Sequence, residues 1–127
     1  MSRDTVPPVR SLVVKVTVGA EALERCHQAF TVAATAAAAG ASVSVWLTAE
    51  ASWLALPGRA ESLVLPHSPP LSDLRDAVLA SGRITVCTQC AARRGINGGD
   101  VVSGIQIAGA ATFVDEVLAP DVQALVY

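Results

Sequence analysis

The hydrophobic pattern of the chain changes its period at Gly40, and this change limits the folds that the chain can adopt. Between residues 20 and 39, apolar side chains recur at spacings of three and four, which is typical of an amphipathic helix. From residue 42 to residue 45 the apolar positions alternate with a period of two, as in a strand, which we expect to extend to Leu47. Residues 12–18 are β-branched and almost continuously apolar, which favours a strand covered on both faces. The order strand, helix, strand predicts a βαβ unit with a right-handed crossover.

The middle of the chain continues this alternation. We expect a short helix over residues 48–54 with Thr48 as its N-cap, and a minor strand over residues 63–65. The next helix is predicted to be capped by Ser72 and to end at Gly82. Its inward side is predicted to hold Leu71, Leu74 and Val78, and its outward side Asp73, Arg75 and Asp76.

The last third of the chain completes the pattern. A third main strand is predicted over residues 84–86, followed by a plain glycine-rich turn over residues 95–99. Residues 101–107 mix helical and strand patterns, so both structures stay open there. A helix over residues 110–118 and a closing strand over residues 122–126 follow. Strands that alternate with helices indicate an α/β domain with a mainly parallel sheet.

The composition supports one folded domain. The chain has 127 residues and a mass of 13.0 kDa, and a chain of this size buries roughly two thirds of its unfolded surface on folding. Apolar residues make up 52% and charged residues only 16%, which excludes a disordered chain. So few charges leave apolar surface uncovered, and we expect this surface to contact other subunits. We assign residues 1–10 to a flexible N-terminal tail and residues 11–127 to the domain.

Charge and cysteine content exclude several classes of protein. The net charge is −2 with a pI near 5.5, and the chain lacks the basic stripe that nucleic-acid binding requires. Residues 26–49 carry no formal charge, but the change of period at Gly40 opposes a membrane-spanning helix. Three cysteines, and a beginning that does not resemble a signal peptide, indicate a reducing compartment. We therefore expect a cytoplasmic protein that binds neither nucleic acid nor membranes.

Two cysteines form the motif Cys-Thr-Gln-Cys directly after the third main strand. The first of them, Cys87, follows Val86 at a strand end, and ligands of parallel α/β sheets bind beyond such ends. If a short helix begins near Gln89, its N–H groups favour a thiolate, and Arg93 and Arg94 add positive charge. A thiolate is the species that attacks a disulfide or accepts a sulfur atom as a persulfide.

Other interpretations of Cys87 and Cys90 stay open. Free cysteines also pack as small apolar residues, so the chain could be a non-catalytic oligomeric module that binds a small anion or metabolite. A CxxC dithiol redox switch is a further alternative, although thioredoxin motifs follow an early strand. A structural zinc site needs four ligands, and Cys26, His27 and His67 are unsuitably spaced to complete one. We therefore expect no metal and no cofactor.

The remaining chemical groups are assigned to structural roles. Cys26 lies on the inward stripe of the first helix, so we predict that it packs in the core and does not act with His27. His67 lies in a proline-rich loop and is expected to be solvated. Trp46 and Trp53 are expected in the core or at a subunit interface.

The cysteine segment resembles a known family. Residues 84–96, with the sequence ITVCTQCAARRGI, are similar to the DsrE/DsrF-like proteins of sulfur metabolism, which include TusD-type sulfur-relay subunits and YchN-like proteins. The sequence VSGIQ at residues 102–106 and the closing residues 122–127 agree with this resemblance. The opening LVVKVTVG strand and the small residues of the first helix agree as well, so the resemblance extends from Leu12 to Tyr127.

The resemblance implies a flavodoxin-like or Rossmann-like three-layer α/β sandwich that assembles as a homotrimer or homohexamer. It also implies a sulfur carrier or sulfurtransferase that holds sulfane sulfur as a cysteine persulfide and exchanges it with donor and acceptor proteins. In sulfur-relay members the carrier cysteine stands eight residues before the glycine of Arg-Arg-Gly, which is the position of Cys87 relative to Gly95. The second cysteine of the YchN-like members corresponds to Cys90. Both cysteines are therefore candidates, with Cys87 preferred.

Overall fold

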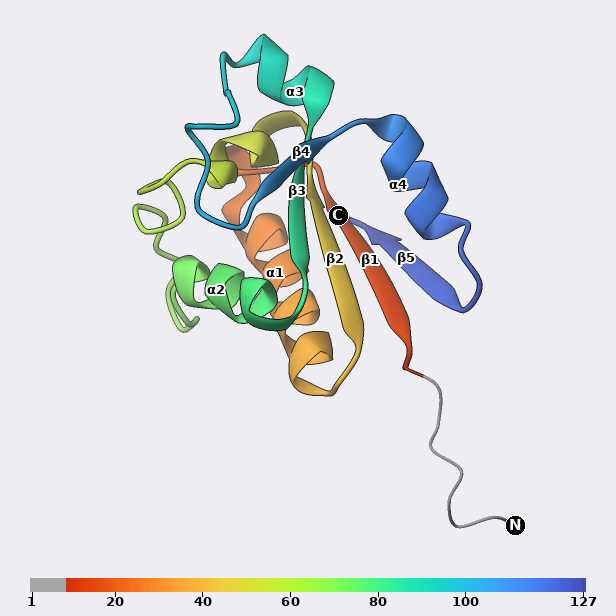
Figure 1. Cartoon of the computed structure of the whole chain (residues 1–127). Helices are drawn as coiled ribbons and strands as arrows, with labels where there is room; N and C mark the ends of the chain where they lie inside the picture. The colour runs from red at the N-terminus through yellow and green to blue at the C-terminus, as the bar shows by residue number, and fades with distance from the viewer. Residues whose placement is uncertain (1–8) are drawn as a thin grey trace, which may run out of the picture.

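The centre of the molecule is a five-stranded parallel sheet, seen in a computed structural model that describes residues 9–127 (Figure 1). The strands lie in the order β4-β3-β2-β1-β5, so β1 lies inside the sheet and later strands extend it on both sides. Their bounds are β1 Ser11–Val16, β2 Ser42–Leu47, β3 Arg83–Cys87, β4 Gln106–Ala108 and β5 Val122–Val126. The parallel sheet that the sequence predicts is confirmed.

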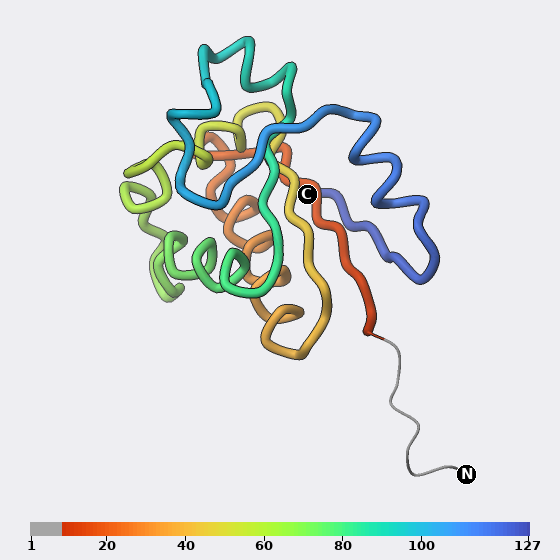
Figure 2. Tube along the Cα trace, viewed as in Figure 1, coloured from red at the N-terminus to blue at the C-terminus, as the bar shows by residue number. Residues whose placement is uncertain are grey.

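Helices on both faces of the sheet make the three layers of the sandwich. Helices α1 (Leu23–Ala38) and α2 (Leu71–Ser81) pack against each other on one face, and α4 (Ala110–Val117) covers the other face (Figure 1). The short α3 (Thr88–Arg93) and the 3-10 helix η2 (Ala49–Ala55) lie beyond the carboxyl ends of β3 and β2 (Figure 2). In an open parallel sheet this edge is where sites form.

The main core lies between the sheet and the layer of α1 and α2. Each strand directs alternate residues toward this layer, as a period of two requires. The buried strand residues on this face are Val14, Val16, Val43, Val45, Leu47, Ile84 and Val86. Small residues of α1, among them Ala29 and Ala33, are fully buried, so the helix axis can lie close to the sheet.

The opposite face of the sheet, beneath α4, mixes polar and aromatic side chains. Trp46 is buried there, and its ring meets Phe113 of α4 edge to face with 5.4 Å between the ring centroids. The Glu116 carboxylate accepts hydrogen bonds from Ser44 Oγ at 2.5 Å and from Trp46 Nε1 at 3.0 Å. Arg83 lies 3.8 Å from the same carboxylate. These contacts attach α4 to β2 and β3, and Trp46 has the core role that the sequence analysis expects.

Three local predictions are wrong. Residues 63–65 form no strand and belong to the loop between η2 and α2. Thr48 stands at the N-cap position of η2 but makes no capping hydrogen bond, because its hydroxyl donates to the carbonyl of Val16 at 3.2 Å. Ser72 does not cap α2, because the helix already begins at Leu71 and Ser72 lies within its first turn.

Arg75 also differs from its predicted outward position, since it is buried. Its guanidinium donates to both carboxylate oxygens of Glu61, at 3.1 and 3.0 Å, and its Nε donates to Asp76 at 3.0 Å. The hydrophobic pattern of a single helix does not reveal this burial, because the covering carboxylate belongs to the loop before α2.

Several helix ends agree with the prediction. A single 3-10 turn, η1 (Ala20–Ala22), precedes α1, and Gly40 follows α1 with a φ of +93°, a conformation that glycine adopts after a helix C-terminus. Residues 101–105 form a loop that leads into β4. Of the tail predicted over residues 1–10, residues 1–8 lie outside the described part of the chain. Within residues 9–127 no helix is long and apolar enough to span a membrane.

Candidate functional site

Cys87 occupies the junction between β3 and α3. It is the last residue of the strand and stands immediately before the first residue of the helix, with φ −63° and ψ 130°. The preceding Val86 is fully buried, whereas Cys87 and Cys90 are both half-buried. The predicted short helix after the strand is therefore confirmed, and both thiols lie at its amino end.

The surroundings of Cys87 favour its thiolate. Burial acts to raise the pKa of the Cys87 thiol, but the N–H groups of Cys90 and Gln89, the Cys90 thiol and the charge of Lys15 together lower this pKa below its ordinary value. The free N–H groups of a helix amino end and a nearby cation are the usual causes of a reactive thiol. Cys87 therefore combines access to solvent with a stabilised thiolate.

Cys90 lies one turn further along α3 and contacts the loop after β2. Its Sγ accepts a hydrogen bond from the backbone N–H of Ala49 at 3.3 Å. Ala49 has a φ of +47°, a conformation that L-residues rarely adopt, and it begins η2. The contact holds the Cys90 sulfur against η2, so the two thiols have different neighbours.

The two arginines after the motif lie differently from each other. The Arg94 guanidinium donates to Glu50 Oε2 at 2.8 Å and to the carbonyl of Cys90 at 3.1 Å, and it lies 6.0 Å from the centre of the Trp53 ring. The hydrogen bond from Arg94 lowers the pKa of the Glu50 carboxyl. Arg93 is exposed, and Gly95 turns the chain after α3 with a φ of +66°. Arg94 thus joins α3 to η2 through an ion pair.

Lys15 is a residue of this site that the sequence analysis does not single out. It lies on β1 in register with Trp46 of β2, which is in register with Thr85 of β3, two residues before Cys87. Its Nζ lies 5.3 Å from the centre of the Phe113 ring. The signal was present in the sequence, because Lys15 interrupts the otherwise apolar strand LVVKVTV.

Cys26 lies in the core and His67 lies in solvent, as the sequence predicts. Cys26 is fully buried, and burial, with the nearby charge of Glu21, raises the pKa of its thiol to about 12. His27 is buried as well and faces the loop before α2 instead of Cys26, whereas His67 is exposed. Within residues 9–127 no three His, Cys, Asp or Glu side chains gather as metal ligands would.

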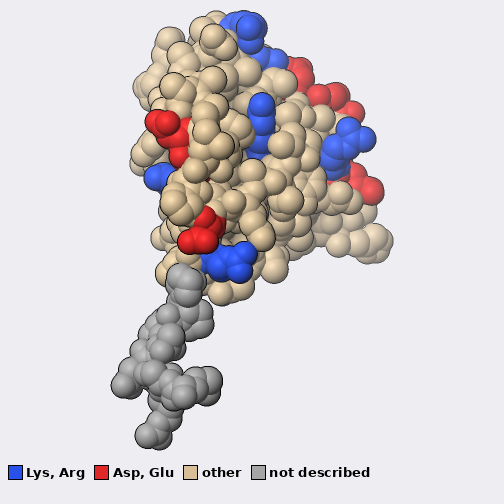
Figure 3. All heavy atoms as spheres, turned by 90° about the vertical axis from the view of Figure 1, so that its right-hand side faces the viewer, with Lys and Arg blue, Asp and Glu red and all other residues tan. Residues whose placement is uncertain are grey.

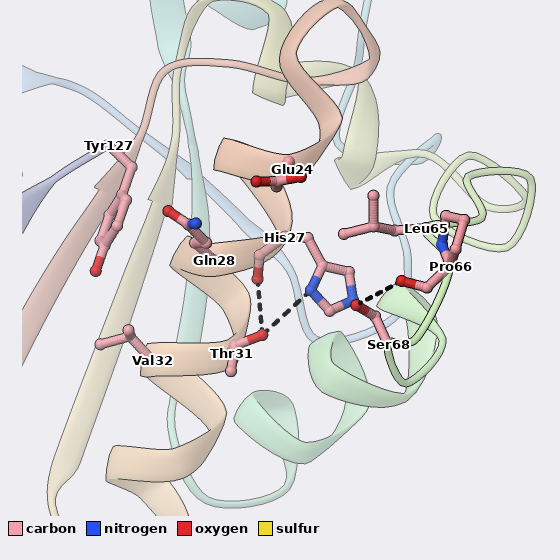
Figure 4. A pocket seen from close by; sticks show the side chains of 9 residues that line it. All are labelled: Glu24, His27, Gln28, Thr31, Val32, Leu65, Pro66, Ser68 and Tyr127. Atoms are coloured by element: carbon pink, nitrogen blue, oxygen red, sulfur yellow. Dashed lines mark hydrogen bonds between the residues drawn. The ribbon is translucent and has the colours of Figure 1, made fainter.

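A groove of about 560 Å³ lies away from the cysteines, along α1 (Figure 4). Its floor is the outer side of α1, and its walls come from the loop at Leu65 to Ser68 and from Tyr127. The ring of His27 points toward this loop, and its Nε2 donates to the carbonyl of Pro69 at 2.9 Å. Its Nδ1 lies 3.2 Å from Thr31 Oγ1. The hydrogen bond of Nε2 therefore holds the loop to the helix, and the contact of Nδ1 with Thr31 lies within α1.

Comparisons with known proteins agree in one family and one fold. The model of the DsrE/DsrF-like family matches residues 10–122. An uncharacterized protein of Methanocaldococcus jannaschii, MJ0760, is 31% identical over 119 residues, which is 93% of this chain. The chain spans 43% of the length of that relative.

Two solved structures share the fold. The YchN protein of E. coli superposes with a TM-score of 0.78 at 15% identity, over 94% of this chain and all of the other. MTH1491, a protein of unknown function from Methanobacterium thermoautotrophicum, superposes with a TM-score of 0.68 at 9% identity over the same shares. At sequence identities this low, the similarity to these two structures shows a shared fold and nothing further.

Proposed function

The chain belongs to the DsrE/DsrF-like family, and on that premise we propose that it carries sulfane sulfur as a persulfide on Cys87. Membership of this family supports a role in sulfur metabolism. The observation that carries the finer proposal is the environment of Cys87, a half-exposed thiol with a lowered pKa beyond the carboxyl end of a parallel strand. A lowered pKa increases the fraction of the thiol that is ionised at a given pH, and a half-exposed thiol is accessible to a sulfur donor.

The proposed transfer is a thiolate displacement. The Cys87 thiolate attacks the outer sulfur of a donor persulfide, R–S–SH, and forms the new S–S bond of Cys87–S–SH. The S–S bond of the donor breaks, and its electron pair leaves with the thiolate R–S⁻. An acceptor thiolate takes the sulfur onward by the same step, so no external oxidant or reductant is required.

Cys90 supports the carrier in this proposal. Its thiol contributes to the lowered pKa of Cys87, and its sulfur is held by Ala49. We assign Cys87 as the carrier and Cys90 as its partner. Arg93, Arg94 and Gly95 shape the loop through which donors and acceptors approach.

Donor and acceptor proteins, and assembly of the chain as a cytoplasmic homotrimer or homohexamer, belong to the same proposal. Support comes from the apolar surface over α4 and β5, where Val114, Leu118, Leu125 and Val126 are exposed. Figure 3 views this side of the molecule, where uncharged side chains cover most of the surface and the charged groups gather in a few places. An interface there would cover these residues.

Mass spectrometry of the loaded protein tests the sulfur-carrier function. The reduced protein is incubated with inorganic polysulfide, freed of excess reagent and digested under non-reducing conditions. We expect an added mass of one sulfur atom on Cys87, its retention in the Cys90→Ser variant and its loss in the Cys87→Ser variant. The absence of an adduct from Cys87 in both the wild-type chain and Cys90→Ser contradicts the proposal.

A dithiol switch is the second candidate function, because the Cys90 thiol contributes to the lowered pKa of Cys87 and so lies close to it. In that case a mild thiol oxidant such as diamide closes a Cys87–Cys90 disulfide, with the loss of two hydrogen atoms. A disulfide that forms and reduces reversibly, in a protein that takes up no sulfur from polysulfide, favours the switch over the carrier.

A further inference from the structure

Lys15 is the only lysine in the chain, and the other eight basic residues are arginines. It lies near the carboxyl end of β1, the strand next to the centre of the sheet, on the face that α4 covers. Among the residues that the structure describes, no carboxylate pairs with its ammonium group, whereas Arg75, Arg83 and Arg94 all have carboxylate partners. A half-buried cation without an anionic partner is costly, which suggests that its charge serves a ligand.

The sheet places Lys15 and Cys87 on the same face. In parallel strands, residues in register project to the same face, and alternate residues along one strand share a face. Lys15, Trp46 and Thr85 are in register across β1, β2 and β3, and Cys87 is the next residue of β3 on that face. Two strand spacings, about 10 Å, separate the backbones of Lys15 and Thr85.

The ring of Phe113 lies next to the ammonium group of Lys15. The Nζ atom lies 5.3 Å from the centre of the Phe113 ring, and this ring packs against Trp46. A cation over an aromatic face is weakly attracted to it and remains able to bind an anion on its open side. Phe113 therefore supports the ammonium group near the carboxyl edge without neutralising it.

The other charged groups nearby are already paired or face elsewhere. Glu116 of α4 accepts from Ser44 and Trp46 and lies near Arg83. Asp115, its neighbour on α4, is exposed. Arg94 is paired with Glu50 on the η2 side of the loop. The charge of Lys15 does act on the Cys87 thiol, since it contributes to the lowered pKa of that group.

We propose that Lys15 forms an anion-binding position beside Cys87, so that this site reacts with small anionic sulfur compounds in preference to neutral ones. The choice of sulfur compounds rests on the proposed function, whereas the preference for anions rests on Lys15 alone. A negatively charged donor such as a hydropolysulfide would place its terminal charge near the ammonium group while its sulfane sulfur meets Cys87. Lys15 is a positioning residue for the donor in this scheme.

Paired alkylating reagents test the preference. Iodoacetate is anionic and iodoacetamide is neutral, and both react with thiolates. The ratio of their rates with Cys87 therefore reports the local charge, independently of how much thiolate is present. The measurement uses the full chain in a Cys90→Ser background at low ionic strength, and mass spectrometry follows the modification of Cys87.

The variants compared are Lys15→Met, Lys15→Arg and Arg25→Met, the last of which removes an exposed cation from α1 on the other side of the sheet. One unit charge at contact distances in water changes such a ratio by about 3- to 10-fold. We expect Lys15→Met to lower the iodoacetate-to-iodoacetamide ratio by this factor and 0.5 M salt to reduce the difference. Lys15→Arg should retain most of the ratio, and Arg25→Met should leave it unchanged.

An unchanged ratio in Lys15→Met overturns the proposal, provided that circular dichroism shows the variant to be folded. A ratio that falls equally in Lys15→Met and Arg25→Met also overturns it, because the effect would then follow the overall charge. Sulfur loading is a separate measurement. A lowered ratio in a protein that accepts no sulfur supports the anion-binding position and contradicts the sulfur-carrier function.

Discussion

Cys26 and Cys87 carry the same side chain in opposite environments. Cys26 is fully buried among the apolar residues of the main core, and its thiol pKa rises to about 12. Cys87 is half-buried beside backbone N–H groups and Lys15, which lower the pKa of its thiol. Residue type therefore says little about reactivity until burial and nearby charge are known.

The first prediction concerns Cys26. Because its raised pKa keeps the thiol protonated across the neutral range, we expect iodoacetamide at pH 8 to label Cys87 and leave Cys26 unmodified in the folded protein. Labelling of Cys26 should begin only in denaturant. Peptide mapping by mass spectrometry measures both sites in one sample, so Cys87 is the internal control. Equal labelling of the two sites under native conditions contradicts the burial of Cys26.

Lys15 belongs to the part of the site that the sequence alone does not reveal. The CxxC motif and its place after a strand were readable from the sequence, since both depend on neighbours along the chain. Lys15 is distant in sequence from Cys87, and only strand pairing across β2 brings it to the same face. Arg94 shows that a residue next to the motif in sequence can have its charge paired with another group. Arg94 is adjacent in sequence to the motif but is paired with Glu50.

At the scale of elements, the junction between α2 and β3 is tightly packed at Gly82. The backbone φ of Gly82 is −132°, which other residues adopt readily, so the constraint is space. A Cβ atom there would lie 2.4 Å from the carbonyl oxygen of Val43 and 3.1 Å from that of Val78. The helix end therefore lies directly against the start of β2.

The second prediction follows from this contact. Gly82→Ala should destabilise the protein by about 1–3 kcal/mol, because the backbone of β2 or α2 must move to admit the methyl group. Gly98→Ala is the matched control, since a Cβ atom at Gly98 meets nothing within 4 Å. The control should change stability by less than about 0.5 kcal/mol. Urea unfolding curves give both values, and equal stability of the two variants contradicts the close packing at Gly82.

The periodicity of apolar residues predicted the helices and main strands well. This periodicity arises because each element buries one side. β5, α4 and the end of α1 agree closely with the prediction. The caps at Thr48 and Ser72 and the outward position of Arg75 are wrong. Two of these errors involve a partner distant along the chain, Val16 for Thr48 and Glu61 for Arg75, whereas α2 begins one residue before Ser72.

At the scale of the whole molecule, the two faces of the sheet are covered unequally. Two helices pack on one face, and α4 on the other leaves Leu118 77% exposed and Val126 67% exposed. β5 forms one edge of the sheet, and most of its residues are exposed. Exposed apolar side chains on an edge strand and on the helix beside it are typical of an interface between subunits.

The third prediction tests this surface as the subunit interface. We expect the wild-type chain to have the mass of a trimer or hexamer in light scattering coupled to size-exclusion chromatography. Leu118→Lys should shift it toward the mass of one chain, because a charge would be buried without a partner. Val64→Lys is the control, as Val64 is equally exposed but lies in the loop before α2. A wild-type protein with the mass of one chain contradicts the prediction.

The sequence by itself determined the order of strands and helices, the parallel α/β class and the motif at the end of β3. These features follow from patterns of burial and from residues adjacent along the chain. Only the tertiary structure decided the strand order, the burial of Arg75 by Glu61 and the approach of Lys15 to Cys87. The physical reason is that pairing and packing bring together residues that are far apart in sequence, and the charge and burial at a thiol depend on those neighbours.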